Sequence, residues 1–300
     1  MADMRFDAQV AIVTGAGHGL GRAHALDLAA RGAKVVVNDL GGTVEGTGAS
    51  TGPASDVVDE IRKTGGVAVA SADNVATPEG AEAIIQTAVS EFGQVDAVIN
   101  NAGILRDRSF MKMTPAEFDT VLAVHLRGSF LVTHAAWPHL RAQGYGRVVM
   151  TSSPAGLFGS FGQANYASAK MGLIGLTKTL AVEGAKYGIK VNAIAPVAHT
   201  RMTAGILPDE LAGEFGPELV TPLVSYLAHS DCAATGQVYS AGGGRVALVV
   251  VAEGPGWVKK DGLTAEDVRD AWEQINAVQP QIVPASAGEQ TAALFSALQG

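Results

Sequence analysis

The stretch that decides the fold is residues 10–21, which read VAIVTGAGHGLG. The apolar run Val10 to Val13 predicts a short buried strand, and residues 24–31 predict an amphipathic helix that Gly32 ends. A glycine-rich turn between a strand and a helix brings backbone amides close to an anion, because the helix N-terminus carries partial positive charge. The stretch therefore predicts a phosphate-binding strand–turn–helix unit, although glycines also occur in ordinary tight turns.

The turn supplies the first candidate contacts to a dinucleotide. Gly15 permits a sharp bend, and the glycines nearer the helix let amides approach a pyrophosphate. His18 fills a variable position within the turn. The candidate cofactor-binding residues here are Gly15, Gly17, His18, Gly19, Leu20 and Gly21.

Asp39 follows the next predicted strand, residues 34–38, about 20 residues after the turn. A carboxylate at this place can bond both ribose hydroxyls of adenosine, and it would repel a 2′-phosphate. The position favours NAD over NADP, unless Asp39 simply caps a loop.

Strands and helices alternate along the rest of the chain. Strands are predicted at residues 67–70, 95–99, 147–150, 190–194 and 237–240, and helices at 53–65, 78–92, 115–143, 163–187 and 217–229. Apolar strands separated by helices indicate a parallel sheet covered on both faces. We expect an α/β three-layer Rossmann fold with a doubly wound, seven-stranded parallel sheet.

The glycines at 242–244 mark a change in composition. We expect one domain over residues 1–245 and a short C-terminal extension over 246–300, packed on the same domain or on a partner subunit. The extension should contain a strand at 245–252 and a helix at 264–275.

Composition narrows the function classes. The net charge of −8 disfavours binding to nucleic acid or to an anionic membrane surface. A single cysteine, no basic-then-apolar leader at the N-terminus and no long apolar run indicate a cytoplasmic protein. The seven histidines are scattered without metal-ligand spacing, so no metal site is expected.

Tyr166 and Lys170 are four residues apart on a predicted helix, so they share one face. That spacing alone is common on solvated helix faces. Ser152 and Ser153 stand at the carboxyl end of a predicted strand, however, where ligands bind in open α/β sheets. The two observations together point to a catalytic site.

The chemistry of these residue types suits hydride transfer, which requires a proton to leave or reach the substrate oxygen. A phenol with a pKa near 10 is a weak base at neutral pH. A neighbouring ammonium and a cationic nicotinamide ring should lower that pKa, and a serine hydroxyl can hold the substrate oxygen. Lys170 could also bond the nicotinamide ribose.

These motifs resemble the short-chain dehydrogenase/reductase family over roughly residues 5–245. The turn at 14–21, the sequence NNAG at 100–103, Ser153, and the pair Tyr166 and Lys170 match in order and spacing. A serine 13 residues before the tyrosine is usual in the family, which selects Ser153 over Ser152. The resemblance implies an oxidoreductase that forms homodimers or homotetramers.

Residues 37–42, 103–110, 124–130 and 161–166 resemble a subgroup, the (3R)-3-hydroxyacyl-CoA dehydrogenase units of type 2 peroxisomal multifunctional enzymes. The resemblance implies NAD-dependent oxidation of a 3-hydroxyacyl-CoA to the 3-ketoacyl-CoA in fatty-acid or sterol side-chain β-oxidation. Two alternatives stay open: a hydroxysteroid or other secondary-alcohol dehydrogenase, and a non-catalytic NAD-binding sensor or scaffold.

The resemblance also implies site residues. The catalytic set would be Ser153, Tyr166 and Lys170, the last two also touching the cofactor. Further cofactor contacts would be Asp73, Asn74 and Val75 at the adenine, Asn101, Ala102 and Gly103 near the adenosine ribose, and Pro196, Ala198, His199 and Thr200 on the nicotinamide side.

The chain departs from the family pattern at two places. His125 stands where many members have a proton-relay asparagine, so it either relays protons or is a buried structural residue. Pro196-Val197 replaces the usual Pro-Gly. Three arginines, Arg106, Arg108 and Arg127, either meet coenzyme A phosphates or lie on a solvated surface in ion pairs.

Overall fold

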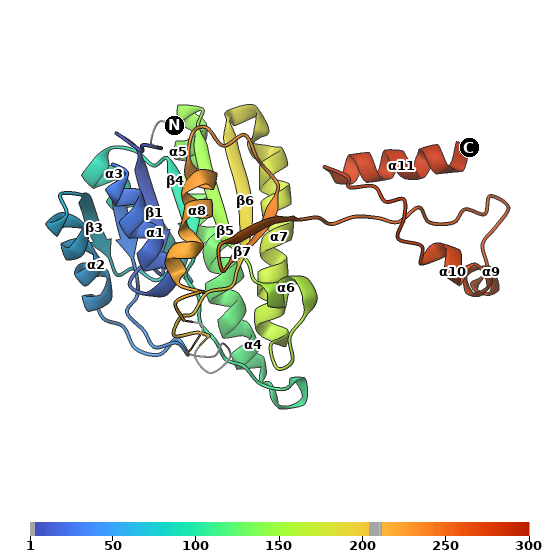
Figure 1. Ribbon diagram of the computed structural model, residues 1–300, viewed down its shortest axis with the longest axis horizontal. Coiled ribbons are helices and arrows are strands. Elements are labelled where there is room, and N and C mark those ends of the chain that lie inside the picture. The colour runs from blue at the N-terminus through green and yellow to red at the C-terminus, as the bar shows by residue number, and fades with distance from the viewer. Residues whose placement is uncertain (1–3, 204–209, 211, 300) are drawn as a thin grey trace. The chain divides into compact units, whose positions relative to one another are not determined.

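A computed structural model describes residues 4–203, 210 and 212–299. Its centre is one eight-stranded sheet with the order β3-β2-β1-β4-β5-β6-β7-β8 (Figure 1). Neighbouring strands from β3 through β7 pair in parallel. The strands are β1 (Val10–Thr14), β2 (Lys34–Asn38), β3 (Val67–Ser71), β4 (Ala97–Asn100), β5 (Gly146–Thr151), β6 (Ile189–Pro196), β7 (Val238–Gly242) and β8 (Arg245–Val249).

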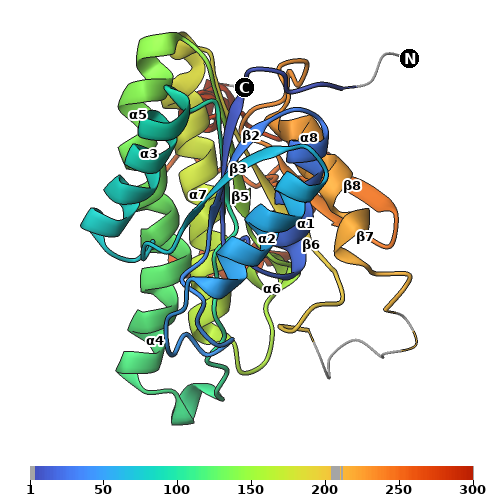
Figure 2. The same ribbon diagram turned by 90° about the vertical axis from the view of Figure 1, so that its left-hand side faces the viewer.

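Helices cover both faces of this sheet. Figure 2 shows α1, α2 and α8 on one side and α3, α4, α5 and α7 on the other. The helices are α1 (Gly19–Ala30), α2 (Gly52–Lys63), α3 (Pro78–Phe92), α4 (Pro115–Leu122), α5 (Gly128–Gln143), α6 (Pro154–Phe158), α7 (Ala164–Gly184) and α8 (Thr221–Ala228). The predicted three-layer, doubly wound Rossmann fold is confirmed.

The core explains why the strands are so apolar. All five residues of β1 and all four of β4 are buried, because helices pack on both faces. Burying each valine or isoleucine side chain contributes about 1.5–3 kcal/mol. The carboxyl ends of these rigid central strands form the edge that carries the site.

The strand count differs from the prediction. We expected a seven-stranded sheet and a further strand at 245–252 in the C-terminal extension, but β8 is the eighth strand of the same sheet. Only Gly243 and Gly244 separate it from β7, and both have positive φ angles, 55° and 75°. Two such residues form a tight hairpin turn, so β8 runs antiparallel to β7. The change in composition at the glycines 242–244 therefore marks a hairpin turn within the sheet.

The long helix predicted over 115–143 is present but not regular. Between α4 and α5 the chain forms a π-helical turn, Ala123–Arg127, which contains His125. Such turns insert one extra residue and are frequent at functional sites. Hydrophobic periodicity cannot reveal a single widened turn. The five-residue α6 was not predicted either, because it is too short to show a period.

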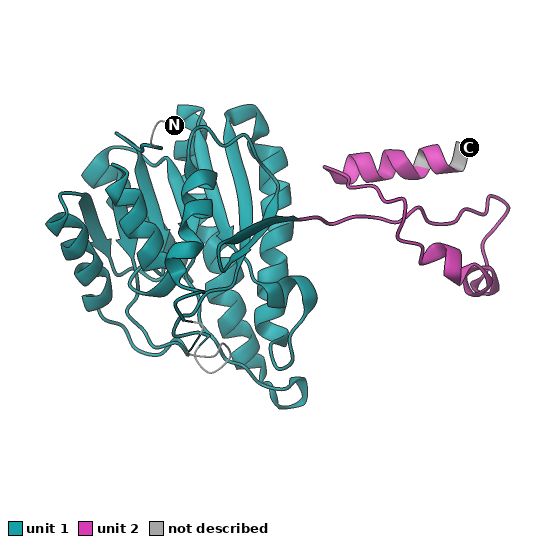
Figure 3. Cartoon of the chain, in the orientation of Figure 1, with its two compact units in different colours: residues 1–248 teal, residues 249–300 magenta. Residues whose placement is uncertain are grey.

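The chain divides into two compact units, residues 1–248 and 249–300 (Figure 3). The second unit contains α9 (Ala265–Asp270), α10 (Trp272–Ile275) and α11 (Ala287–Gln299). The helix predicted over 264–275 is two short helices, the first begun by a capping box between Thr264 and Asp267. Where the second unit packs stays a prediction.

Candidate active site

The glycine-rich turn joins β1 to α1 and admits no side chain at its closest points. A Cβ at Gly15 would lie 2.7 Å from the Cα of Ala102, and one at Gly21 would lie 2.2 Å from the carbonyl oxygen of Gly15. Gly15 also has a φ of 63°, which favours glycine. The turn is therefore held in one tight shape at the N-terminus of α1.

Thr14 and Asn101 fix the turn to the end of β4. The hydroxyl of Thr14 accepts hydrogen bonds from the N–H groups of Asn101 and Ala102, at 3.0 and 3.1 Å. The Asn101 amide in turn donates to the carbonyl oxygens of Thr14 and Gly15, both at 3.0 Å. Two neighbouring strand ends thus form one rigid platform.

Asp39 stands at the end of β2 and faces this platform. One carboxylate oxygen accepts from the Gly17 N–H at 2.8 Å, and the other accepts from the Gly41 N–H at 2.7 Å. A Cβ at Gly17 would come within 2.8 Å of the first oxygen, so the approach requires glycine. Backbone amides hold the carboxylate in place, and its negative charge lies beside the turn.

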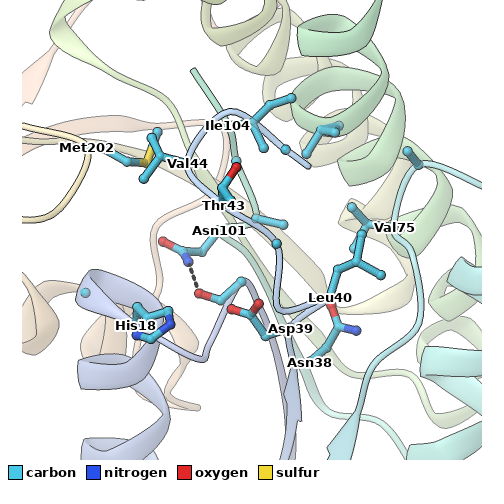
Figure 4. Close-up of a pocket in the computed structure, with 18 of the residues that line it drawn as sticks. His18, Asn38, Asp39, Leu40, Thr43, Val44, Val75, Asn101, Ile104 and Met202 are labelled. Carbon is cyan, nitrogen blue, oxygen red and sulfur yellow. Dashed lines mark hydrogen bonds between the residues drawn. The ribbon is translucent and has the colours of Figure 1, made fainter. Parts of the chain in front are cut away.

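A cavity of about 330 Å³ opens over the turn (Figure 4), a volume suited to small ligands. Many of the predicted cofactor contacts line it. These are Gly15, His18, Gly19, Leu20, Asp39, Asp73, Asn74, Val75, Asn101, Ala102, Gly103 and Thr200. The glycine cradle and Asp39 fit the phosphates and the ribose of a dinucleotide.

Other predicted cofactor residues do not line this cavity. Gly17 and Gly21 are buried behind the turn, where they shape it. Ala198 is also buried, and the His199 N–H donates to the carbonyl oxygen of Phe215 at 2.6 Å. Pro196, Tyr166 and Lys170 are the remaining residues outside the lining. Their contact with a cofactor stays a prediction.

Several lining residues escaped the sequence analysis. The main group is the loop after Asp39, which contributes Gly42, Thr43, Val44 and Gly46. The glycines at 41, 42 and 46 were a signal, because such a density right after the acidic strand end permits a close-fitting loop. The others are Asn38, Leu40, Ala76, Ile104, Thr120, Ala123, Val124, Arg201 and Met202.

The two serines after β5 have different environments. Ser152 is 1% exposed, and its hydroxyl donates to the Lys170 carbonyl oxygen at 2.8 Å. Ser153 is half-buried at the start of α6, where its oxygen accepts from the Ala155 N–H. Ser153 also forms a hydrogen bond with the hydroxyl of Tyr166. Ser152 therefore supports the helix, and Ser153 lies beside the tyrosine.

Tyr166 and Lys170 lie together on α7 as the spacing predicted. The Lys170 ammonium is 5.4 Å from the Tyr166 ring centroid and donates to the Thr151 carbonyl oxygen. Burial lowers the pKa of Lys170 to about 7. Burial raises the pKa of Tyr166, with a smaller contribution from the Asp107 charge, whereas the Ser153 hydrogen bond lowers it. Lys170 is not among the groups that shift the pKa of Tyr166 here, so the expected lowering by Lys170 together with the nicotinamide ring stays a prediction.

His125 lies in the π-helical turn and is 1% exposed. Its Nε2 is 3.0 Å from the N–H of Ile104 and 2.8 Å from the carbonyl oxygen of the same residue. Its ring meets the Tyr166 ring edge-on, with centroids 5.2 Å apart. Burial, and then the Lys170 charge, hold the pKa of His125 well below its ordinary value. Within the described residues Nδ1 has no hydrogen-bond partner.

The three arginines weighed as phosphate contacts bond to the protein itself. Arg106 donates from Nε to the Glu45 carbonyl oxygen at 3.0 Å, and Arg127 donates to that of Ala76 at 2.5 Å. Arg108 forms a 3.3 Å ion pair with Glu117. Arg106 and Arg127 therefore bond to backbone carbonyl oxygens, where ion pairs were the expected alternative to phosphate contacts.

A nucleotide-shaped cradle and a serine–tyrosine–lysine cluster, both at the carboxyl edge of one doubly wound sheet, define a Rossmann-fold oxidoreductase. The chain belongs to the short-chain dehydrogenase family: the family's sequence model, described as short chain dehydrogenase, matches residues 9–211.

Three relatives show the range of the similarity. A putative short-chain type dehydrogenase/reductase of Mycobacterium tuberculosis is 54% identical, with 89% of this chain and 93% of that protein covered. The peroxisomal multifunctional enzyme type 2 of Mus musculus is 48% identical over 95% of this chain but only 39% of its own length. Hydroxyacyl-CoA dehydrogenase ChsB1 of Mycobacterium tuberculosis is 45% identical, with 80% and 79% covered.

A solved structure agrees with the fold. Full-length peroxisomal multifunctional enzyme type 2 from Drosophila melanogaster superposes with a TM-score of 0.84 at 40% identity, covering 99% of this chain and 50% of that one. The chain thus spans half or less of the two multifunctional enzymes compared here.

Two features of the described residues concern membranes and metal ions. No helix among them is both long and apolar enough to cross a bilayer. Nor do the described histidines and carboxylates, with the single cysteine, gather into a group that could hold a metal ion.

Proposed function

We propose that the protein oxidises a 3-hydroxyacyl-CoA to the 3-ketoacyl-CoA with NAD, with Tyr166 as the general base. The observation that carries this proposal is the cluster at the start of α7. There the Tyr166 hydroxyl bonds to Ser153, and Lys170 lies near the tyrosine ring. The thioester part of the substrate is supported by the similarity to a hydroxyacyl-CoA dehydrogenase.

The residues of the chain handle the substrate oxygen and its proton. Ser153 and Tyr166 would both hydrogen-bond the substrate hydroxyl, which fixes the carbinol carbon. The Tyr166 phenolate takes the hydroxyl proton as the C–H bond breaks, and Ser153 offsets the charge that develops on the oxygen. When bound, NAD accepts the hydride, and its positively charged ring favours the phenolate.

Lys170 and His125 surround the base with groups that titrate. The pKa of Lys170 is lowered to about 7, so its ammonium can give up a proton near neutral pH. His125 is held neutral by burial and lies edge-on to the tyrosine ring. We propose that Lys170 passes the proton onward and that His125, anchored by a hydrogen bond between Nε2 and the Ile104 backbone, chiefly positions the tyrosine through the edge-on ring contact.

Asp39 supports NAD as the coenzyme. Its carboxylate is fixed by two backbone amides beside the turn, where its negative charge would repel a 2′-phosphate. NADP would therefore bind weakly. A site that prefers NAD in this way does not need the arginine that commonly binds the 2′-phosphate of NADP.

Assembly and location complete the proposal. We propose a homodimer or homotetramer that works in the cytoplasm. The sole cysteine, Cys232, is free and buried, which suits a reducing compartment.

The test is NADH formation by the purified full chain with a series of (3R)-3-hydroxyacyl-CoA thioesters, from short acyl to sterol-sized. Each thioester is paired with its free alcohol or free hydroxy acid. We expect turnover with thioesters and much slower turnover with the free compounds. Turnover with a free hydroxysteroid alone would establish the other dehydrogenase class, and no turnover with any member would refute the proposal.

A further inference from the structure

The loop after Asp39 crosses the cofactor cavity, and we call residues 41–51 the strap. Figure 4 shows Thr43 and Val44 at the cavity, on the side where Ile104 lies. The strap closes on itself, because the N–H groups of Thr43 and Gly46 donate to the carbonyl oxygens of Thr47 and Thr43 at 2.9 and 3.0 Å. It is thus a formed element and not a loose connection.

The strap rests on residues 104–108, which follow β4 and which we call the central segment. The Leu105 N–H donates to the Val44 carbonyl oxygen at 2.9 Å, and the Arg106 side chain donates to that of Glu45. A Cβ on Gly46 would lie 2.9 Å from the Ile104 side chain. Consecutive residues of the central segment therefore hold consecutive residues of the strap.

The same segment holds the start of the catalytic helix. The Asn165 amide donates to the Arg106 carbonyl oxygen at 2.9 Å, and its oxygen accepts from the Tyr166 N–H at 2.8 Å. Gln163 donates to Asp107 at 2.7 Å. Asn165 is fully buried. The first N–H groups of a helix lack partners within it, so Asn165 determines where the Tyr166 backbone sits.

We propose that Arg106 and Asn165 are positioning residues that couple closure of the strap over the dinucleotide to the placement of Tyr166. The side chain of Arg106 holds the strap, and the backbone carbonyl oxygen of Arg106 holds the side chain of Asn165. A ligand that favours the closed strap then also favours the fixed position of the tyrosine, and the coupling is reciprocal. This inference rests on the dinucleotide site of the proposed function and is independent of the substrate.

The test is hydrogen exchange of the full chain with and without NADH. Arg106→Ala removes the bond to the strap, and Arg108→Ala is the matched control because that side chain pairs with Glu117 instead. In the wild type and the control, NADH should slow exchange in peptides covering 41–51 and 160–170. In Arg106→Ala, both peptides should lose protection, and NADH should dissociate about tenfold faster.

Two results would overturn the coupling. One is an unchanged exchange pattern in Arg106→Ala at saturating NADH. The other is a strap that loses protection while the peptide containing Tyr166 keeps it, because the two elements would then move independently.

A second pair of variants tests the seat of the strap without touching Arg106. Gly46 and Gly48 both have a φ of 78°, so alanine must adopt the same unfavourable φ at each. Only at Gly46 does the new Cβ meet Ile104, whereas nothing lies within 4 Å at Gly48. Gly46→Ala should release NADH several-fold faster than Gly48→Ala, and equal rates would contradict the inference.

These readouts use NADH alone. A failure here leaves the 3-hydroxyacyl-CoA reaction untouched, and a chain inactive towards every thioester would leave the exchange result standing.

Discussion

The two halves of the carboxyl edge of the sheet consist of different kinds of chemical group. Around β1 and β2 the cradle consists of backbone amides, glycines and the fixed carboxylate of Asp39. After β5, on α7 and in the π-helical turn, the site consists of side chains whose pKa values are shifted chiefly by burial, namely Tyr166, Lys170 and His125. The first half fits the shape of a dinucleotide, and the second surrounds Tyr166 with titratable groups.

This difference indicates that the second half alone does not favour the ionised form of Tyr166. Burial raises the pKa of Tyr166 and lowers that of Lys170, so both neutral forms are favoured. A neutral phenol cannot act as the base in alcohol oxidation. In the proposed function, the positive charge that favours the phenolate comes through the half that binds the coenzyme.

The largest effect should follow Tyr166→Phe. Removing the general base should lower kcat by about 10²–10⁴-fold, while NADH affinity stays nearly unchanged. Turnover and NADH binding are measured on the same preparation. Tyr145→Phe is the control, because it also removes a bonded hydroxyl, here the acceptor of Gln9, but Tyr145 precedes β5 whereas Ser153 follows the other end of that strand. Retained activity in Tyr166→Phe would refute the catalytic assignment.

A smaller effect should follow Asp39→Asn, which keeps the acceptor for one backbone amide but removes the charge. Relieving the repulsion of a 2′-phosphate should raise the NADP-to-NAD preference by about 10²-fold. The ratio of kcat/KM values for the two coenzymes measures it. Asp73→Asn, at the same cavity, should change the ratio far less. An unchanged ratio in Asp39→Asn would remove Asp39 as the specificity residue.

The smallest effect concerns a buried titratable group in the first half. His24 on α1 bonds to the Thr221 hydroxyl of α8 at 2.8 Å, and burial lowers its pKa to about 3. A depressed histidine pKa stabilises the fold fully above pH 6.5, and that contribution is lost as the pH falls from 6.5 towards 3. The slope is at most about 1.4 kcal/mol per pH unit.

Denaturant unfolding at several pH values checks this prediction. His24→Gln should show a flatter loss of stability between pH 6.5 and 4 than the wild type. His134→Gln, at an exposed position of α5, is the control and should keep the wild-type slope. Parallel curves for wild type and His24→Gln would show that the ring is not held neutral.

The residues of the first half could be predicted from the sequence because each depends on neighbours that are close along the chain or at the adjacent strand end. Gly15 and Gly21 are required by contacts within the turn or with the adjacent strand end, and Asp39 follows directly after its strand. The parallel sheet likewise follows from the alternation of apolar runs and helices. These features need no knowledge of distant side chains.

The remaining features depend on distant partners. The strap needs the central segment across the cavity, and the π-helical turn at His125 accompanies a bond to Ile104, 21 residues away. Ser152 and Ser153 look alike until the burial of one is known. The direction of the Tyr166 pKa shift also reflects burial, which neither spacing nor residue type reveals.

The most direct test of this division is to compare two titrations of Tyr166. In the free protein, the difference in phenolate absorbance between wild type and Tyr166→Phe should give a pKa above the ordinary 10.0. With saturating NAD, kcat for alcohol oxidation should rise with pH through a clearly lower value, because the base must be ionised. The same pKa in both titrations would contradict the account, because the catalytic half would then need no charge from the coenzyme.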